Sequence, residues 1–207
     1  MRAVFIFFVL LLLLSLAVPV TIASQIWMDG GAVLARAERS GALRAPAASG
    51  PLTGVERTIA MNEFPETWRT RTTPCRTLAF LWADIATDNA PRGMPVSQRL
   101  AARLMSDRRG TSVRGHLLRI VVACQLEHRF EDPQLLRMWL AGANFGQGAV
   151  GLENAAQALF GKPSRDLNAE ESARLAVLLR APSLRSRPEQ WAERARATQE
   201  RLAARAR

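Results

Sequence analysis

Several residue types are scarce in this sequence of 207 residues, and their scarcity narrows the kind of protein it encodes. Lys162 is the only lysine, histidine and cysteine occur twice each, and aromatic residues make up 6% of the chain. The many arginines are scattered, and no zinc-ligand spacing is present. Common nucleic-acid-binding domains depend on clustered basic residues, zinc ligands or aromatic platforms. The sequence therefore argues against a nucleic-acid partner.

The two cysteines, Cys75 and Cys124, form no metal-binding pattern with His116 and His128, so the residues predict no metal site. In an oxidising compartment the two cysteines can pair. Cys124, however, lies in the apolar run of residues 120–126, which is typical of a buried thiol. The sequence leaves both alternatives open and favours two free thiols.

Charged residues are absent from residues 3–23, AVFIFFVLLLLLSLAVPVTIA. As a helix rising ~1.5 Å per residue, this run spans about 31 Å, close to the thickness of a bilayer core. Arg2 precedes the run, which favours a cytoplasmic N-terminus. A cleaved signal peptide is the alternative, but the run exceeds the usual apolar core of such peptides and no clean A-x-A site follows. We predict a single-pass anchor in the cytoplasmic membrane, with the rest of the chain on its outer side.

Composition divides the chain into three parts: an anchor at 1–23, a linker at 24–51 and a folded domain at 52–207. The linker mixes Gly, Ala, Ser, Pro and Arg without firm periodicity, and we interpret it as a tether with a short helix at 32–39. The net charge of +10 suits anionic lipid headgroups or a pyrophosphate group.

Residues 131–183 carry the clearest helix signals. Pro133 suits the first turn of one helix, and a second helix over 152–160 ends at Gly161. Asn168 and Glu171 have the spacing of a capping box at the start of a third helix, which stops before Pro182. The four glycines at 142, 146, 148 and 151 predict tight turns between the first two helices.

A last helix is predicted over 188–207, with Pro188 in its first turn and its arginine-rich face in solvent. Alternating apolar and polar residues of the kind that mark strands are lacking. Together these signals predict an all-α domain.

The stretch of residues 131–183 resembles the C-terminal half of the peptidoglycan glycosyltransferase domain, glycosyltransferase family 51. Its pattern includes F-G-x-G-x-Y-G-I-x-x-A-A-x-x-Y-F-G-K and, further on, L-x-x-x-E-A-A-x-L-A-x-L-x-x-A-P-S. The matches include Phe145-Gly146, Gly148, Gly151, Ala155-Ala156, Phe160-Gly161-Lys162, Glu171 and Ala181-Pro182-Ser183. The resemblance covers about residues 52–194 and implies a lysozyme-like transglycosylase domain.

The first catalytic motif of this family, A-x-x-E-D-x-x-F-x-x-H, falls on VERTIAMNEFPETWRTR. In the register set by Ile59 and Ala60, Asn62 occupies the position of the catalytic Glu and Glu63 that of the Asp. An amide cannot exchange a proton near neutral pH, so Asn62 cannot act as general acid or base. A slip of one residue would make Glu63 the catalytic group.

Two further motifs of the family are also altered. The segment GMPVSQRLAARL resembles G-x-S-T-I-T-Q-Q-L-A, which implies substrate contacts for Ser97 and Gln98, with Arg99 in place of the second Gln. In RGHLLRIVVACQLE, the register set by Ala123 and Glu127 places Arg119 where the family has a second acid. Arg114, His116 and Arg119 still form a basic cluster at helical spacing, suited either to a pyrophosphate or to a solvated helix face.

The family polymerises a lipid-linked disaccharide-pentapeptide: a general base deprotonates the acceptor sugar, and cations, often with a divalent metal, assist the departing pyrophosphate. The resemblance therefore implies a lipid-linked precursor or glycan strand, the membrane and other cell-wall synthesis proteins as partners. Two hypotheses remain open. One is a glycosyltransferase with Glu63 as its base; the other is a pseudo-enzyme that binds precursor or a cell-wall partner without polymerising it.

The membrane topology can be tested with reporters fused after Arg207. We expect alkaline phosphatase to be active there, because the predicted anchor carries the C-terminal domain out of the cytoplasm. A fluorescent reporter that matures only in the cytoplasm is the control. A bright cytoplasmic reporter together with inactive alkaline phosphatase would contradict the predicted orientation.

Overall fold

The computed structural model describes residues 2–43, 50–65, 75–79, 82, 93–106 and 112–205; the side chains of residues 2–14 and 16 lie outside this description. The described chain is helical and holds no strand, with one isolated bridge between Asn144 and Val150. These findings confirm the predicted all-α class for the described part of the chain. The closer likeness to lysozyme stays a prediction.

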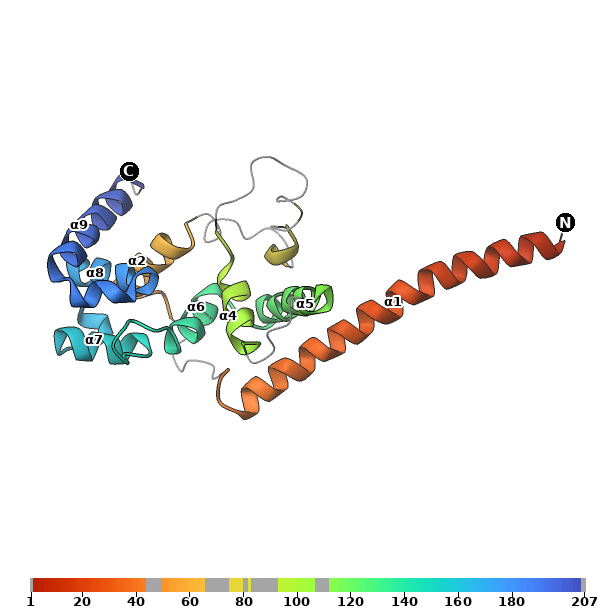
Figure 1. Cartoon of the computed structure of the whole chain (residues 1–207), viewed down its shortest axis with the longest axis horizontal. Helices are drawn as coiled ribbons and strands as arrows, with labels where there is room; N and C mark the ends of the chain where they lie inside the picture. The colour runs from red at the N-terminus through yellow and green to blue at the C-terminus, as the bar shows by residue number, and fades with distance from the viewer. Residues whose placement is uncertain are drawn as a thin grey trace.

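The N-terminal part of helix α1 (Arg2–Arg39) projects away from the rest of the molecule, and its C-terminal half packs against α5 (Val113–Arg129) (Figure 1). The contact buries Ile26, Val33, Leu34 and Ala37. Residues 24–39 are therefore helical throughout, whereas the sequence predicted a tether with a short helix at 32–39. The apolar packing of this half on α5 outweighs its weak local helix signals.

The predicted membrane anchor falls mostly on residues whose side chains lie outside the described set. Within the described residues, no helix is both long and apolar enough to cross a membrane.

The predicted helices of residues 131–183 are confirmed as α6 (Asp132–Ala141), α7 (Leu152–Phe160) and α8 (Ala169–Arg180). The capping box is present, because the Asn168 side chain accepts from the backbone N–H of Glu171 and the Glu171 carboxylate accepts from that of Asn168. Gly161 adopts the left-handed conformation that ends α7. Short 3₁₀ turns, η1 (Ser164–Asp166) and η2 (Pro182–Ser186), connect to α8 and to α9 (Pro188–Arg205).

The predicted glycine-rich loop lies between α6 and α7 and reaches back to the segment after α8. Gly146 has a φ of +90°, and a Cβ atom there would lie 2.7 Å from the carbonyl oxygen of Pro182. The Arg185 guanidinium donates a hydrogen bond to the Gly146 carbonyl at 2.9 Å. The glycine is needed because both its dihedral angle and this close approach exclude a side chain.

The helices form two groups joined by α6. Helix α2 (Gly54–Glu63) packs on α8, and α8 on α9; separately, α4 (Val96–Leu104) packs on α5 and α6 (Figure 1). The fully buried side chains come from both groups and include Ile59, Leu100, Leu126, Leu136 and Leu178. This arrangement brings the ends of α2, α4, α8 and α9 toward one another.

The cysteines are paired, so the preference for free thiols was wrong. Cys75 and Cys124 form a disulfide that joins the segment 75–79 to α5. The buried position expected for Cys124 is correct, but the fold carries Cys75 to the same place. The backbone N–H of Arg76 and the Thr77 hydroxyl also donate to the Glu127 carboxylate of α5, which fixes this segment beside the disulfide.

The N-terminus of α2 is held by a buried ion pair. Thr53 and Glu56 form a capping box, and the Glu56 carboxylate accepts a hydrogen bond from Arg137 of α6 at 2.8 Å. Burial raises the pKa of Glu56, but the hydrogen bonds and charge of Arg137 and the Thr53 backbone N–H outweigh it, so the pKa lies below its ordinary value of 4.5. Ionised Glu56 therefore stabilises the fold at neutral pH.

We expect Glu56→Gln to lower the free energy of unfolding by about 3 kcal/mol at pH 7, because Arg137 loses its buried counter-ion. The folded-state pKa of Glu56 is lowered, so its contribution is complete above pH 4.5 and is lost as the pH falls below that value. Denaturant unfolding at pH 7 and below pH 4.5 measures the free energy of unfolding of variant and wild type. The difference between these two free energies should become smaller at the lower pH. Glu170→Gln, at a half-exposed pair with Arg174, is the control and should cost at most about 0.5 kcal/mol. A pH-independent difference would contradict the assignment.

Candidate functional site

Asn62 and Glu63 form the last turn of α2 and are both buried, with 6% and 1% of their surface exposed. Ile59 and Ala60, one turn earlier, are fully buried and hold this end of the helix against the core. A charged carboxylate in such a place requires partners, because an isolated buried charge is strongly unfavourable.

Three donors surround the Glu63 carboxylate. Oε2 accepts from the Arg99 guanidinium of α4 at 3.0 Å, and Oε1 accepts from Arg180 Nε of α8 at 2.7 Å. The Asn62 amide nitrogen donates to the same Oε1 at 3.1 Å. A general base must come within hydrogen-bond distance of the proton it removes. In this arrangement Glu63 is the counter-ion of two guanidiniums, and its role as a general base stays a prediction.

A cavity of about 210 Å³ opens beside this carboxylate. Four arginines line it: Arg99, Arg180, and Arg201 and Arg205 of α9. Arg201 also donates to the Asn62 side-chain oxygen at 2.9 Å. Because the described lining residues include four arginines and a single carboxylate, they carry excess positive charge and suit a phosphate-like anion.

Arg99 is held in place by more than its ion pair. Its guanidinium carbon lies 5.1 Å from the centre of the Phe64 ring and 5.8 Å from that of Trp139, within the range of cation–π contacts. The two rings meet edge to face at 5.3 Å. Arg99 is therefore a fixed part of the cavity wall, whereas Arg180 is 56% exposed at its side chain.

Three of the four cavity arginines were missed by the sequence analysis. Arg201 and Arg205 are four residues apart on one face of α9 and are exposed, as expected for that face, but they also line the cavity. Arg180 follows the apolar residues of α8 immediately before Ala181-Pro182-Ser183, with no local sign of a site. The spacing of Arg201 and Arg205 indicates that they share a helix face. Nothing in the sequence indicates that this face lies opposite Asn62.

The predicted substrate contacts at Ser97 and Gln98 do not line the cavity. Ser97 is fully buried, and its hydroxyl donates to the Glu127 carboxylate of α5. That bond ties α4 to α5 and thereby positions Arg99, two residues further along. Gln98 is half-buried. A direct role of either residue in substrate binding stays a prediction.

The predicted basic cluster of α5 also lies outside the cavity lining. Arg114 forms an exposed ion pair with Asp29 of α1 at 2.7 Å, and His116 is exposed. Arg119 is half-buried, and its Nε has no hydrogen-bond partner among the described residues. The structure does not bring this cluster together with Glu63, and its part in binding stays a prediction.

The cavity residues do not fit the divalent metal that the family resemblance allowed. Metals such as Mg²⁺ need several oxygen ligands. Glu63 is the one carboxylate among the described lining residues, and guanidiniums already bind it. No group of three or more potential ligands occurs in the described part of the chain.

The sequence profile of the transglycosylase family matches residues 74–206, and the chain belongs to this family. The match begins at residue 74, after Asn62 and Glu63. The alignment of these two residues with the first catalytic motif therefore depends on their neighbours Ile59 and Ala60.

Several bacterial proteins are similar to parts of the chain. Penicillin-binding protein 1C of Escherichia coli is 33% identical over 58% of the chain, and penicillin-binding protein 1A of Aquifex aeolicus is 34% identical over 44%. A biosynthetic peptidoglycan transglycosylase of Shewanella denitrificans is 41% identical over 33% of the chain. The matches cover 16%, 12% and 30% of these relatives, less than a third of each.

A double-mutant cycle can test the shared dependence of Arg99 and Arg180 on Glu63. Arg99→Gln or Arg180→Gln alone leaves one guanidinium bonded to the Glu63 carboxylate. The double variant leaves Asn62 as its donor among the described residues. We expect the double variant to lose about 0.5–3 kcal/mol more unfolding free energy than the two single losses combined. Arg165→Gln, at an exposed pair with Asp166, is the control and should stay within about 0.5 kcal/mol of wild type. Additive losses at Arg99 and Arg180 would refute the shared counter-ion.

Proposed function

We propose that this protein is a membrane-anchored member of the transglycosylase family that binds the lipid-linked peptidoglycan precursor and polymerises it weakly or not at all. Family membership and the names of the similar proteins support a place in peptidoglycan synthesis. The uncharged run of residues 3–23 supports the anchor, the cytoplasmic membrane as the location and an outward-facing domain.

The observation that carries the proposal is that the Glu63 carboxylate is already hydrogen-bonded to three donors, Arg99, Arg180 and Asn62. These donors occupy three of its roughly four acceptor sites, which leaves little room for a sugar hydroxyl. The neighbouring position is Asn62, an amide without acid–base capacity near neutral pH. The site thus holds the charge needed for an anionic ligand without a free base.

The arginine cavity is the part of the site that would hold the diphosphate of the precursor. Arg201 and Arg205 of α9 lie beside Asn62, and neither pairs with Glu63 in the described structure. Arg180 is exposed enough to turn toward a ligand, while Arg99 stays stacked on two aromatic rings. Guanidinium groups bind phosphates through paired, charge-assisted hydrogen bonds.

The second candidate function is a working glycosyltransferase in which Glu63 is the base. The location of Glu63 on the cavity wall favours it. In that case the precursor diphosphate would draw Arg180 away and free one acceptor site of Oε1, while Asn62 continues to donate to that oxygen. Glu63 would then be within reach of an acceptor hydroxyl.

A polymerisation assay with fluorescent lipid-linked disaccharide-pentapeptide separates the two functions. For the full chain in detergent we expect little or no product ladder from the wild type and from Glu63→Gln. Asn62→Glu places a second carboxylate at the family position, and even slight gain of activity would support the register given above. Robust wild-type turnover that falls ~10²–10⁴-fold in Glu63→Gln, the usual loss for a general base, would contradict the proposal.

The binding part is tested by titrating the same precursor into the wild type and into Arg201→Gln/Arg205→Gln. Each lost charge-assisted hydrogen bond is worth about 1.5–3 kcal/mol, so the affinity should fall at least about tenfold. Arg196→Gln/Arg187→Gln removes the same charge from residues outside the cavity lining and should bind as the wild type does. If only Arg114→Gln or Arg119→Gln lowered the affinity for the precursor, the anion site would lie on α5 and the proposal for the arginine cavity would be wrong.

A further inference from the structure

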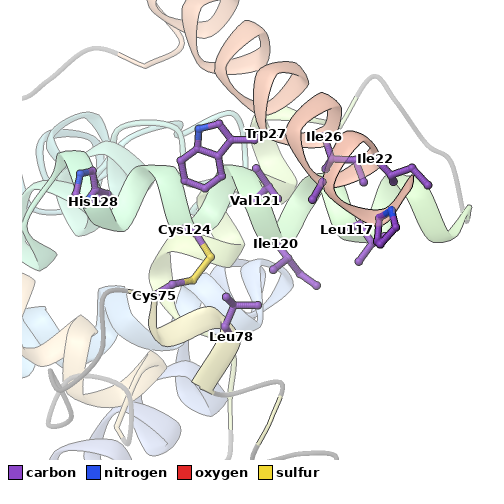
Figure 2. A pocket seen from close by; sticks show the side chains of 12 residues that line it. Ile22, Ile26, Trp27, Cys75, Leu78, Leu117, Ile120, Val121, Cys124 and His128 are labelled. Carbon is purple, nitrogen blue, oxygen red and sulfur yellow. A yellow bond between two sulfur atoms is a disulfide. The ribbon is translucent and has the colours of Figure 1, made fainter. Parts of the chain in front are cut away.

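A second cavity, unrelated to the arginines, lies where α1 crosses α5. It is a groove of about 610 Å³, within the size range of pockets for small hydrophobic ligands. Figure 2 shows Ile22, Ile26 and Trp27 of α1 on one side and Leu117 and Ile120 of α5 on the other, with Leu78 and the disulfide below them.

The walls of the groove are apolar and partly open to solvent. Ile22, Trp27 and Leu78 are each about half exposed, at 50%, 52% and 52%. Leu117 is 42% exposed. His128 is the one titratable residue among the described lining residues, so a polar ligand would find few partners here. Exposed apolar surface of this kind is unfavourable in water and marks a binding surface.

The position of the groove along α1 indicates what covers it. Pro19, Ile22 and Ala23 belong both to the groove and to the last turns of the uncharged run 3–23. The next charged residue of α1 is Asp29, paired with Arg114. On the proposed membrane anchoring, the groove is therefore continuous with the bilayer core at one end and reaches the aqueous side at the other.

We infer that this groove holds an acyl chain of a membrane phospholipid between α1 and α5. The apolar walls of the groove and its continuity with the bilayer core favour such a chain over a partner that approaches from the aqueous side. The prenyl chain of the precursor is a poorer fit in location, since the arginine cavity is lined by residues of α2, α4, α8 and α9 and shares none with the groove. The inference depends on the proposed anchor but not on the proposed lack of catalysis.

The test uses the full chain in vesicles of phosphatidylglycerol and phosphatidylethanolamine that contain a phospholipid with a photoreactive group within one acyl chain. After flotation and illumination, mass spectrometry should find lipid adducts on residues 117–121 of α5. Ile120→Glu places a charge in the groove, so labelling of α5 should fall about tenfold or more. Val113→Glu makes the same change on α5 outside the groove lining, at a side chain 76% exposed, and should leave labelling of α5 unchanged.

Leu117→Trp fills the groove without adding charge and should also reduce labelling of Ile120, which guards against a folding defect in the charged variant. Adducts confined to α1, or α5 labelling that both groove variants leave unchanged, would overturn the inference while the anchor stands. Loss of the α5 adducts when unlabelled lipid-linked precursor is added would identify a prenyl chain as the occupant and refute the phospholipid. Protein that fails to float would refute the anchor and the groove ligand together.

Discussion

The buried Glu63 carboxylate is the group on which the arrangement of the cavity depends. It joins α2 to α4 through Arg99 and to α8 through Arg180, and its neighbour Asn62 extends the network to α9 through Arg201. Without this carboxylate, Arg99 and Arg180 would have no counter-ion among the described residues. A cavity with excess positive charge thus needs one negative group inside it to be stable. Glu63 can fill that structural role whether or not it takes part in catalysis.

Much of the helical part of this fold could be predicted because its signals are local. The capping box of Asn168 and Glu171, the stop at Gly161 and the turn glycines are each decided by a few neighbouring residues, and the structure confirms them. The length of α1 could not be predicted in the same way. Its second half is helical because Ile26, Leu34 and Ala37 pack on α5, which begins more than 70 residues after α1 ends.

The candidate site was less predictable because its residues come together only through the fold. Glu63 was singled out from its place in a motif, but its partners Arg99 and Arg180 come from two other helices. The disulfide was misjudged for the same reason: Cys124 looked like a buried thiol, and its partner is separated from it by 49 residues. The arginines of α9 are exposed, as expected, but sequence periodicity tells which residues share a face and not which cavity that face lines.

The cavity and the groove use different helices but share one mechanical connection. Glu127 of α5 accepts hydrogen bonds from Ser97 of α4 and from Arg76 and Thr77, next to the disulfide. These bonds make α4, α5 and the segment 75–79 one unit, so a shift of α5 relative to α1 carries Arg99 with it. Arg180 and Arg201 belong to the other group of helices, and among the described residues Glu63 and Asn62 of α2 link them to Arg99. Arg99 and Glu63 therefore form one of the contacts between the two groups, beside those of α6, and through α4 and α5 this contact is linked to the helix that forms one wall of the groove.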